Sequence, residues 1–191
     1  MVDVSAKQET VREAIAHVTI KLKPATLLAA RAGQLAKGDV FGVARTAGIL
    51  AAKRTPDLIP LCHPLRITGV DVIFADDLRR STVTVEARVR TVDKTGVEME
   101  ALTAAAVAAL TVYDMVKAID REVIVTDLCL IEKSGGKSGH WRRAAAGGAT
   151  LLGPGRAALR PPGGASGRAL RRPRRAATQV PPARGRRDGE R

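Results

Sequence analysis

The sequence of 191 residues is poor in aromatic side chains and in cysteine. Only 2% of its residues are aromatic while 45% are hydrophobic, so a core must be built from Ala, Val, Leu and Ile. No apolar run approaches the roughly 20 residues that a membrane-spanning helix needs. The first seven residues contain no apolar segment typical of a secretory signal, so a cytoplasmic location is expected. Cys62 and Cys129 are expected to be reduced thiols, because no disulfide framework surrounds them.

The excess of positive charge lies mostly at the C-terminus. The net charge is +13, and residues 144–191 hold eleven arginines and only two acids, which accounts for +9 of it. In the same segment 37 of 48 residues are Ala, Gly, Pro or Arg. Such a composition buries too little apolar surface to offset the entropy of ordering, which predicts a disordered tail behind a domain at 1–143. The arginine cluster at 171–175 leaves open a contact with RNA or acidic surfaces.

The domain has the pattern of an α+β protein. Alternating apolar residues predict strands at 11–23, 67–74, 82–92 and 122–131, with a hairpin turn at 75–80. Helical spacing predicts helices at 24–33, 38–56 and 98–119. The order β-α-α-β-β-α-β favours an antiparallel sheet with helices packed on one face.

The longest predicted helix carries charges only near its ends. Its body, residues 101–110, is small and apolar on every side, which predicts burial all round. Glu98 and Glu100 begin it, and acids there also complement the helix dipole. Near its end Asp114 and Lys117 are i,i+3 neighbours that can pair. We expect this pair to be semi-buried, with pKa values suited to proton transfer.

A rigid loop at 60–65 places Cys62 and His63 between two prolines. A zinc site is a weak hypothesis, because the loop offers only two potential ligands. A Cys nucleophile activated by His is also weak, because adjacent residues of an extended chain point to opposite sides. His63 as a proton donor or phosphate contact is favoured, and a structural loop is the alternative.

A glycine-rich segment at 133–139 resembles an anion cradle. Glycines let backbone N–H groups converge on phosphate oxygens, and Lys133 and Lys137 add charge. The segment lacks the first glycine of a P-loop, and a flexible surface turn is the alternative. Lys37 precedes the second helix, and Lys53 and Arg54 lie at its end. Together with Lys133 and Lys137, these cations from separate segments could neutralise the charges of a polyphosphate ligand.

Five separated strings carry a family resemblance: KGD at 37–39, AAKRTPDLIPLCHPL at 51–65, KTGVEMEALT at 94–103, YDM at 113–115 and EKSGGKSG at 132–139. In this order they resemble the cyclic pyranopterin monophosphate synthase family, the molybdenum cofactor biosynthesis protein C family, over about residues 1–143. Two positions depart from the family pattern, with Thr46 in place of Ile and Val116 in place of Cys. Neither departure removes a matched functional residue.

The resemblance implies a ferredoxin-like subunit in a homohexamer of three dimers, with active sites at the dimer interface. The implied reaction converts (8S)-3′,8-cyclo-7,8-dihydroguanosine 5′-triphosphate, the product of a preceding radical enzyme, into cyclic pyranopterin monophosphate and diphosphate. The implied catalytic residues are Asp114, Lys117, Lys37 and His63. The implied substrate contacts are Leu61, Cys62, His63, Met99, Glu100, Glu98, Lys133 and Lys137. No metal ligand and no required cofactor are expected, and whether Mg²⁺ accompanies the triphosphate is left open.

Two other functions stay open at this point. An RNA-binding protein that uses the tail would show an affinity that falls steeply with salt and disappears on truncation after Arg143. A domain that merely binds GTP or another nucleotide would release no pyrophosphate from the cyclised substrate.

Overall fold

The computed structural model describes residues 1–144. Along the chain lie β1 (Thr10–Lys21), α1 (Pro24–Arg31), α2 (Val40–Lys53), α3 (Thr55–Leu58), β2 (Ile67–Asp77), β3 (Thr82–Asp93), α4 (Glu98–Val116), β4 (Ile124–Ser134) and β5 (Trp141–Arg142). Apart from Ala144, the tail predicted at 144–191 lies outside the described residues.

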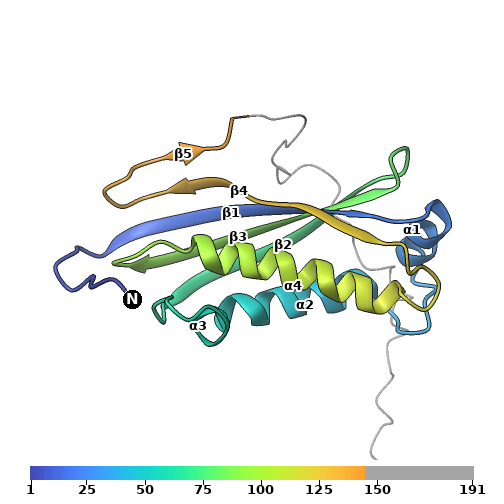
Figure 1. The fold of residues 1–191 in the computed structure, drawn as a ribbon, viewed down its shortest axis with the longest axis horizontal. Coiled ribbons are helices and arrows are strands. Elements are labelled where there is room, and N and C mark those ends of the chain that lie inside the picture. Colours follow the sequence, from blue (N-terminus) through green and yellow to red (C-terminus); the bar gives the residue numbers. More distant parts are fainter. Residues whose placement is uncertain (145–191) are drawn as a thin grey trace, which may run out of the picture.

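The strands form one antiparallel sheet in the order β2-β3-β1-β4-β5. Helices α2 and α4 lie side by side on one face of it (Figure 1). The order β2-β3-β1-β4, with helices after β1 and after β3, is the ferredoxin-like arrangement of two split βαβ units. The predicted fold class is therefore confirmed.

The core lies between the sheet and these two helices. In β1 every second residue from Ala14 is completely buried and belongs to the core, because side chains alternate between the faces of a strand. The set is Ala14, Ala16, Val18 and Ile20. Phe74 from β2 is also completely buried, and its ring centroid lies 5.3 Å from that of Phe41 in α2. Two of the few aromatic residues thus pack together within the core.

The antiparallel helices α2 and α4 approach closely through small residues. A Cβ added at Gly48 would lie 2.9 Å from the carbonyl oxygen of Ala104 and 3.2 Å from Cβ of Ala108. Helix α2 begins with a capped turn, in which the backbone N–H of Gly42 donates to the Asp39 carboxylate at 2.9 Å. Since the helices run in opposite directions, the start of α2 meets the end of α4.

Helix α4 differs from its prediction in two respects. It ends at Val116 rather than at 119, and it is not buried all round, because Leu110 is 59% exposed. By length and composition α4 could also cross a membrane, against the expectation that no run approaches that length. However, 56% of the 18-residue stretch that meets this criterion is buried inside the protein, as in a helix that packs into a core.

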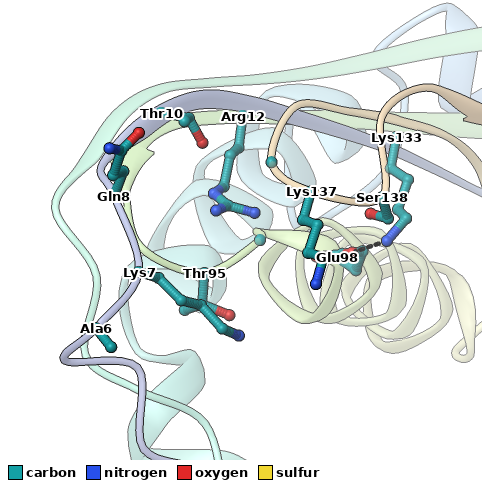
Figure 2. A pocket seen from close by; sticks show the side chains of 12 residues that line it. Ala6, Lys7, Gln8, Thr10, Arg12, Thr95, Glu98, Lys133, Lys137 and Ser138 are labelled. Carbon is teal, nitrogen blue, oxygen red and sulfur yellow. Dashed lines mark hydrogen bonds and ion pairs between the residues drawn. The ribbon is translucent and has the colours of Figure 1, made fainter.

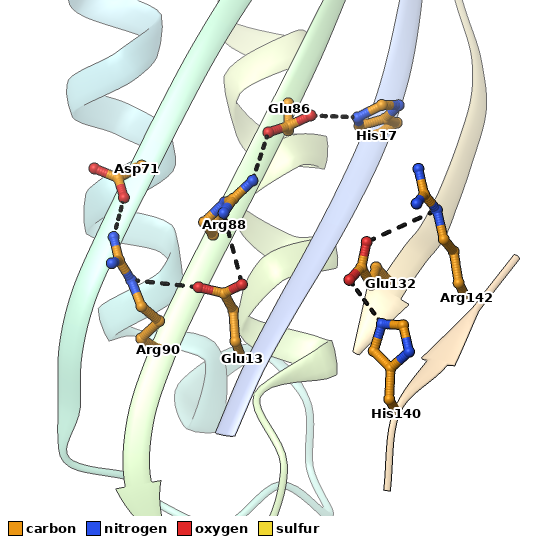
Figure 3. A network of polar contacts seen from close by, with 9 residues as sticks. All are labelled: Glu13, His17, Asp71, Glu86, Arg88, Arg90, Glu132, His140 and Arg142. Atoms are coloured by element: carbon orange, nitrogen blue, oxygen red, sulfur yellow. Dashed lines mark hydrogen bonds and ion pairs between the residues drawn. The ribbon is translucent and has the colours of Figure 1, made fainter. Parts of the chain in front are cut away.

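The face of the sheet opposite the helices carries a ladder of charges across three strands (Figure 3). Glu13 in β1 lies between Arg88 and Arg90 in β3, with nitrogen–oxygen distances of 3.6 Å to each, and Arg90 also pairs with Asp71 in β2. Further along, buried His17 lies 2.8 Å from buried Glu86. Glu13 and Arg90 are direct cross-strand partners, as are His17 and Glu86, whereas the other two pairs are diagonal neighbours.

Other elements also differ from the predictions, as three examples show. Residues 55–56, which were expected to close a helix, begin α3, because Pro56 suits the first turn of a helix. The hairpin turn is shorter than 75–80, since β2 continues to Asp77. Strand β5, which had no counterpart in the prediction, pairs Trp141 with Lys133 after the chain reverses through the glycine-rich segment.

Candidate active site

At the C-terminal end of α4, one carboxylate holds two lysines. Asp114 Oδ1 lies 2.6 Å from Lys117 Nζ, and Asp114 Oδ2 lies 2.6 Å from Lys37 Nζ. Lys37 Nζ also donates to the Asp114 carbonyl oxygen at 2.9 Å. The pairing of Asp114 with Lys117 is as predicted. Lys37 joins them because it stands just before α2, whose start packs beside the end of α4.

The hydrogen bonds from Lys117 and then Lys37 lower the pKa of Asp114 to about 2, and the same carboxylate raises the pKa of Lys117. All three residues belong to the exposed surface, with side chains 46 to 53% accessible to solvent, so the prediction of a semi-buried pair is wrong for a single copy of the chain. The hydrogen bonds and charges of the lysines, rather than burial, control this carboxylate. At neutral pH the cluster is one carboxylate between two ammonium groups.

A second group of predicted residues lies at the N-terminal end of α4. The Glu98 carboxylate accepts a hydrogen bond from Lys133 Nζ at 2.9 Å, across from the end of β4. Glu100 is only 2% exposed, and within residues 1–144 no cation lies within salt-bridge distance of it. Burial raises the pKa of Glu100 to about 7, and the neighbouring charge of Glu98 adds to the effect. Glu100 is therefore a carboxyl group that exchanges its proton near neutral pH.

The loop that follows α3 approaches this same end. Leu61 is exposed, whereas Cys62 and His63 are half-buried. Burial, and next the charge of Glu100, raise the pKa of the Cys62 thiol. The pKa of Asp3, in the segment before β1, is lowered first by hydrogen bonds from Ser5 and more weakly by the charges of Lys94 and then His63. Met99, also among the predicted contacts, is partly exposed on the first turn of α4.

A cavity of about 640 Å³ opens beside the Glu98–Lys133 pair (Figure 2). Four cations line it: Lys133 and Lys137, which were predicted, and Lys7 and Arg12, which were not. Their side chains converge on the space between the glycine loop, defined here as residues 134–139, and the turn before α4. Glu98 is the only acid among the lining residues described, so the cavity is strongly cationic. Such a lining suits a ligand that carries several negative charges.

One pattern in the sequence could have identified Arg12. Arg12, Ala14 and Ala16 are alternate residues of β1, so Arg12 lies on the strand face that carries the core. A charged residue at a core-facing position is unusual and indicates a specific partner. Lys7, in the segment before β1, has no comparable pattern.

The glycine loop adopts backbone conformations that favour glycine. Gly135, Gly136 and Gly139 have φ values of 92°, 71° and 62°. The loop follows a strand and opens no helix, in agreement with the sequence, and it turns the chain back so that β5 pairs with β4. Its backbone forms one wall of the cavity.

The two groups of predicted residues are far apart within one copy of the chain. Glu98 and Asp114 are separated by sixteen positions of α4, which corresponds to about 24 Å at 1.5 Å per residue. Lys37 and Lys117 lie with Asp114, whereas the remaining predicted contacts gather at the opposite end. Figure 1 shows α4 running the length of the helical layer between them.

Metal ligands were not predicted, and among residues 1–144 no three His, Cys, Asp or Glu side chains gather as a metal site requires. Cys62 and His63 thus have no third protein ligand in this part of the chain. The chemistry available here is that of ammonium groups, carboxylates of contrasting pKa and one imidazole.

Comparison with known proteins relates this geometry to a family. Residues 1–136 match the family model described as the MoaC family. The cyclic pyranopterin monophosphate synthase of Heliobacterium modesticaldum is 61% identical over 143 residues, which cover 75% of this chain and 90% of that protein. The proteins of the same name from Pelotomaculum thermopropionicum and a Roseiflexus species are 58% and 60% identical, over 75% and 74% of this chain and 84% and 89% of theirs. A match of this extent and identity means that the chain belongs to the MoaC family.

Proposed function

We propose that this protein is a lyase of molybdenum cofactor biosynthesis. It converts (8S)-3′,8-cyclo-7,8-dihydroguanosine 5′-triphosphate into cyclic pyranopterin monophosphate with release of diphosphate. Membership of the family supports this reaction. The structural observation that carries it is the pairing of a cation-lined cavity with an Asp–Lys–Lys cluster, each at one end of the same helix.

The cavity is the proposed site for the triphosphate. Lys7, Lys133 and Lys137 provide ammonium groups, and the glycine loop exposes backbone to the same space. Ammonium groups and converging backbone N–H groups stabilise phosphate oxygens and the charge that develops on departing diphosphate. Because Lys133 is already paired with Glu98, a phosphate would compete with this carboxylate for the amine.

The groups with contrasting pKa values are proposed to act on the rings. Asp114, with its pKa of about 2, stays ionised and orients the ammonium groups of Lys37 and Lys117, which serve as proton donors. Glu100, with its pKa of about 7, can take or give a proton near neutral pH. His63 stays the predicted proton donor or phosphate contact. Leu61, Cys62 and Met99, at the Glu100 end of α4, are proposed to contact the substrate.

We further propose that each active site is shared between two copies of the chain. The phosphate cavity and the Asp114 cluster are about 24 Å apart along α4, and exposed apolar helix surface lies between them rather than a binding cleft. Val43 and Leu50 of α2 and Leu110 of α4 are about half exposed, and a shallow groove of about 420 Å³ runs along α2.

If two helical layers meet through this surface about a two-fold axis, with the α4 helices antiparallel, the Asp114 end of one copy lies against the Glu100 end of the other. The partner would then bury the exposed Asp114 cluster. The homohexamer of three dimers implied by the family resemblance stays a prediction, and so does a cytoplasmic location. Light scattering of the purified full chain measures the assembly.

The decisive test supplies the cyclised nucleotide to the purified full-length protein and follows products by mass spectrometry and diphosphate release. The proposal predicts cyclic pyranopterin monophosphate and diphosphate from this substrate and neither product from GTP. Binding of both nucleotides without diphosphate release would instead identify a nucleotide-binding domain. Repeating the assay with EDTA determines whether Mg²⁺ is needed.

A further inference from the structure

Arg12 joins the start of β1 to the segment that leads into α4. Its Nε donates to the carbonyl oxygen of Asp93 at 3.0 Å, and its Nη2 donates to that of Lys94, also at 3.0 Å. These carbonyls stand immediately before Thr95 and Gly96, which line the cavity, and Glu98 follows them as the first residue of α4. One side chain thus fixes the backbone from which Glu98 projects.

The same guanidinium group packs against the glycine loop. A Cβ added at Gly136 would overlap Nη1 of Arg12 and would lie 2.7 Å from Cζ, and the three heavy atoms nearest to it all belong to Arg12. A Cβ at the adjacent Gly135 would overlap the carbonyl oxygen of Val11. The loop backbone therefore lies directly on the Val11–Arg12 segment. This close contact fixes the loop that joins Lys133 to Lys137.

Arg12 also offsets the partial negative charge of two carbonyl oxygens, those of Asp93 and Lys94, just before the cavity residues Thr95 and Gly96. Without it, the carbonyl oxygens of Asp93 and Lys94 would lose a charged donor, and their partial negative charge would disfavour an anion bound nearby. Two of its five N–H groups are used by these carbonyls, and Figure 2 shows its guanidinium reaching into the cavity.

We propose that Arg12 is a positioning residue, whose guanidinium clamps the turn before α4 to the glycine loop and so sets the spacing of Glu98, Lys133 and Lys137 around an anionic ligand. This inference rests on the proposed function of the cavity as the phosphate site. Its chemistry needs arginine specifically. A lysine retains the charge, but its single ammonium group lacks the planar fork that bridges two carbonyls while lying flat on a glycine.

The test measures binding of inorganic tripolyphosphate to the full chain by calorimetry, together with turnover of the cyclised nucleotide. Arg12→Lys is expected to weaken tripolyphosphate binding by about tenfold or more, because misplaced lysines lose charge-assisted hydrogen bonds. Lys7→Ala is the matched control, since Lys7 lines the cavity but makes no hydrogen bond to the carbonyls of Asp93 and Lys94 among the described residues. It should weaken binding less than Arg12→Lys does, although it removes a charge that Arg12→Lys keeps.

A second pair of variants examines the clamp without changing any charge. Gly136→Ala and Gly139→Ala place alanine at similar positive φ values, but a Cβ at Gly139 meets nothing within 4 Å. Gly136→Ala should weaken tripolyphosphate binding more than Gly139→Ala does in the wild-type background. In an Arg12→Ala background the two should be equal, because the added methyl group no longer meets a guanidinium.

The outcomes separate this inference from the proposed function. If the wild-type chain binds tripolyphosphate and Arg12→Lys binds it equally well, the clamp is wrong and the phosphate site stands. Melting temperatures that fall in the Arg12 variants while affinity is unchanged would also overturn it, because that is a purely structural role. If the wild-type chain binds no tripolyphosphate and does not turn over the cyclised nucleotide, the proposed function and this inference fail together.

Discussion

The buried carboxyl of Glu100 makes a quantitative prediction about stability and pH. Its pKa is raised from the ordinary value of 4.5 to about 7, mainly by burial. Between these values the folded chain keeps a proton that the unfolded chain releases, so stability must fall as pH rises from 4.5 to 7. The size of this loss is about 3 kcal/mol, at 1.36 kcal/mol for each pH unit by which the two pKa values differ.

The perturbation is Glu100→Gln, which keeps the shape of the side chain and removes its charge. Below pH 4.5 the variant and the wild type should unfold with nearly equal free energies, because Glu100 is neutral in both states of the wild type. Above pH 7 the variant should be more stable by up to about 3 kcal/mol, because it never buries a charge. The same variant should lose turnover if Glu100 contacts the substrate.

Urea denaturation followed by circular dichroism, at one protein concentration and at pH values from 4.5 to 8.5, measures this difference. Met99→Gln is the control, since it introduces the same side chain at the next position without removing a titrating group. Its difference from the wild type should not change with pH. A constant difference between Glu100→Gln and the wild type over the whole range would refute the assignment of a raised pKa to Glu100.

Three further perturbations test the site and the core. Asp114→Asn should abolish turnover while the far-ultraviolet circular dichroism spectrum is retained, and full turnover by the variant would contradict the role of Asp114. Because the pKa of Asp114 is about 2, its ionisation should contribute no acid limb to the wild-type rate profile between pH 5 and 9. Gly48→Ala should lower the free energy of unfolding by about 1 to 3 kcal/mol, as overpacking does, because the added methyl group meets the Ala104 carbonyl oxygen at 2.9 Å; a melting temperature equal to the wild type would show that α2 and α4 separate without cost. Asp39→Ala should cost about 1 kcal/mol through loss of the helix cap, with Asp39→Asn close to the wild type in the same melting assay.

Local patterns predicted the elements that depend on local physics. The alternation of Val18 and Ile20 places β1 on the core because a strand has a period of two, and both residues are completely buried. The second helix is predicted to begin near residue 38, and in the structure Asp39 caps α2 there, because the first N–H groups of a helix need an acceptor. The pairing of Asp114 with Lys117 follows from i,i+3 spacing on one helix.

Other features depend on contacts between distant segments, and no local pattern contains them. Strand β5 forms only because the glycine loop reverses the chain and brings Trp141 beside Lys133. Leu110 fits the pattern of a buried helix and is nevertheless 59% exposed in a single copy of the chain. The role of Arg12 follows from two backbone carbonyls about 80 positions away in the sequence.

The family resemblance supplied a list of site residues but not their grouping in space. Lys37 and Lys133 are both expected to serve one substrate, yet they lie at opposite ends of α4. Only the three-dimensional structure shows that one copy of the chain separates them. This separation is the reason for proposing a shared site.

Subunit mixing tests that proposal most directly. Lys37→Ala and Lys133→Ala should each be inactive alone, and the two are then co-expressed or dissociated and reassembled together. If each site takes Lys37 from one copy and Lys133 from the other, half of the random dimers are mixed and each mixed dimer has one intact site. Activity should then return to about a quarter of the wild-type value. A mixture that assembles into mixed dimers but stays inactive would contradict the account, because it would mean that both lysines act within one copy.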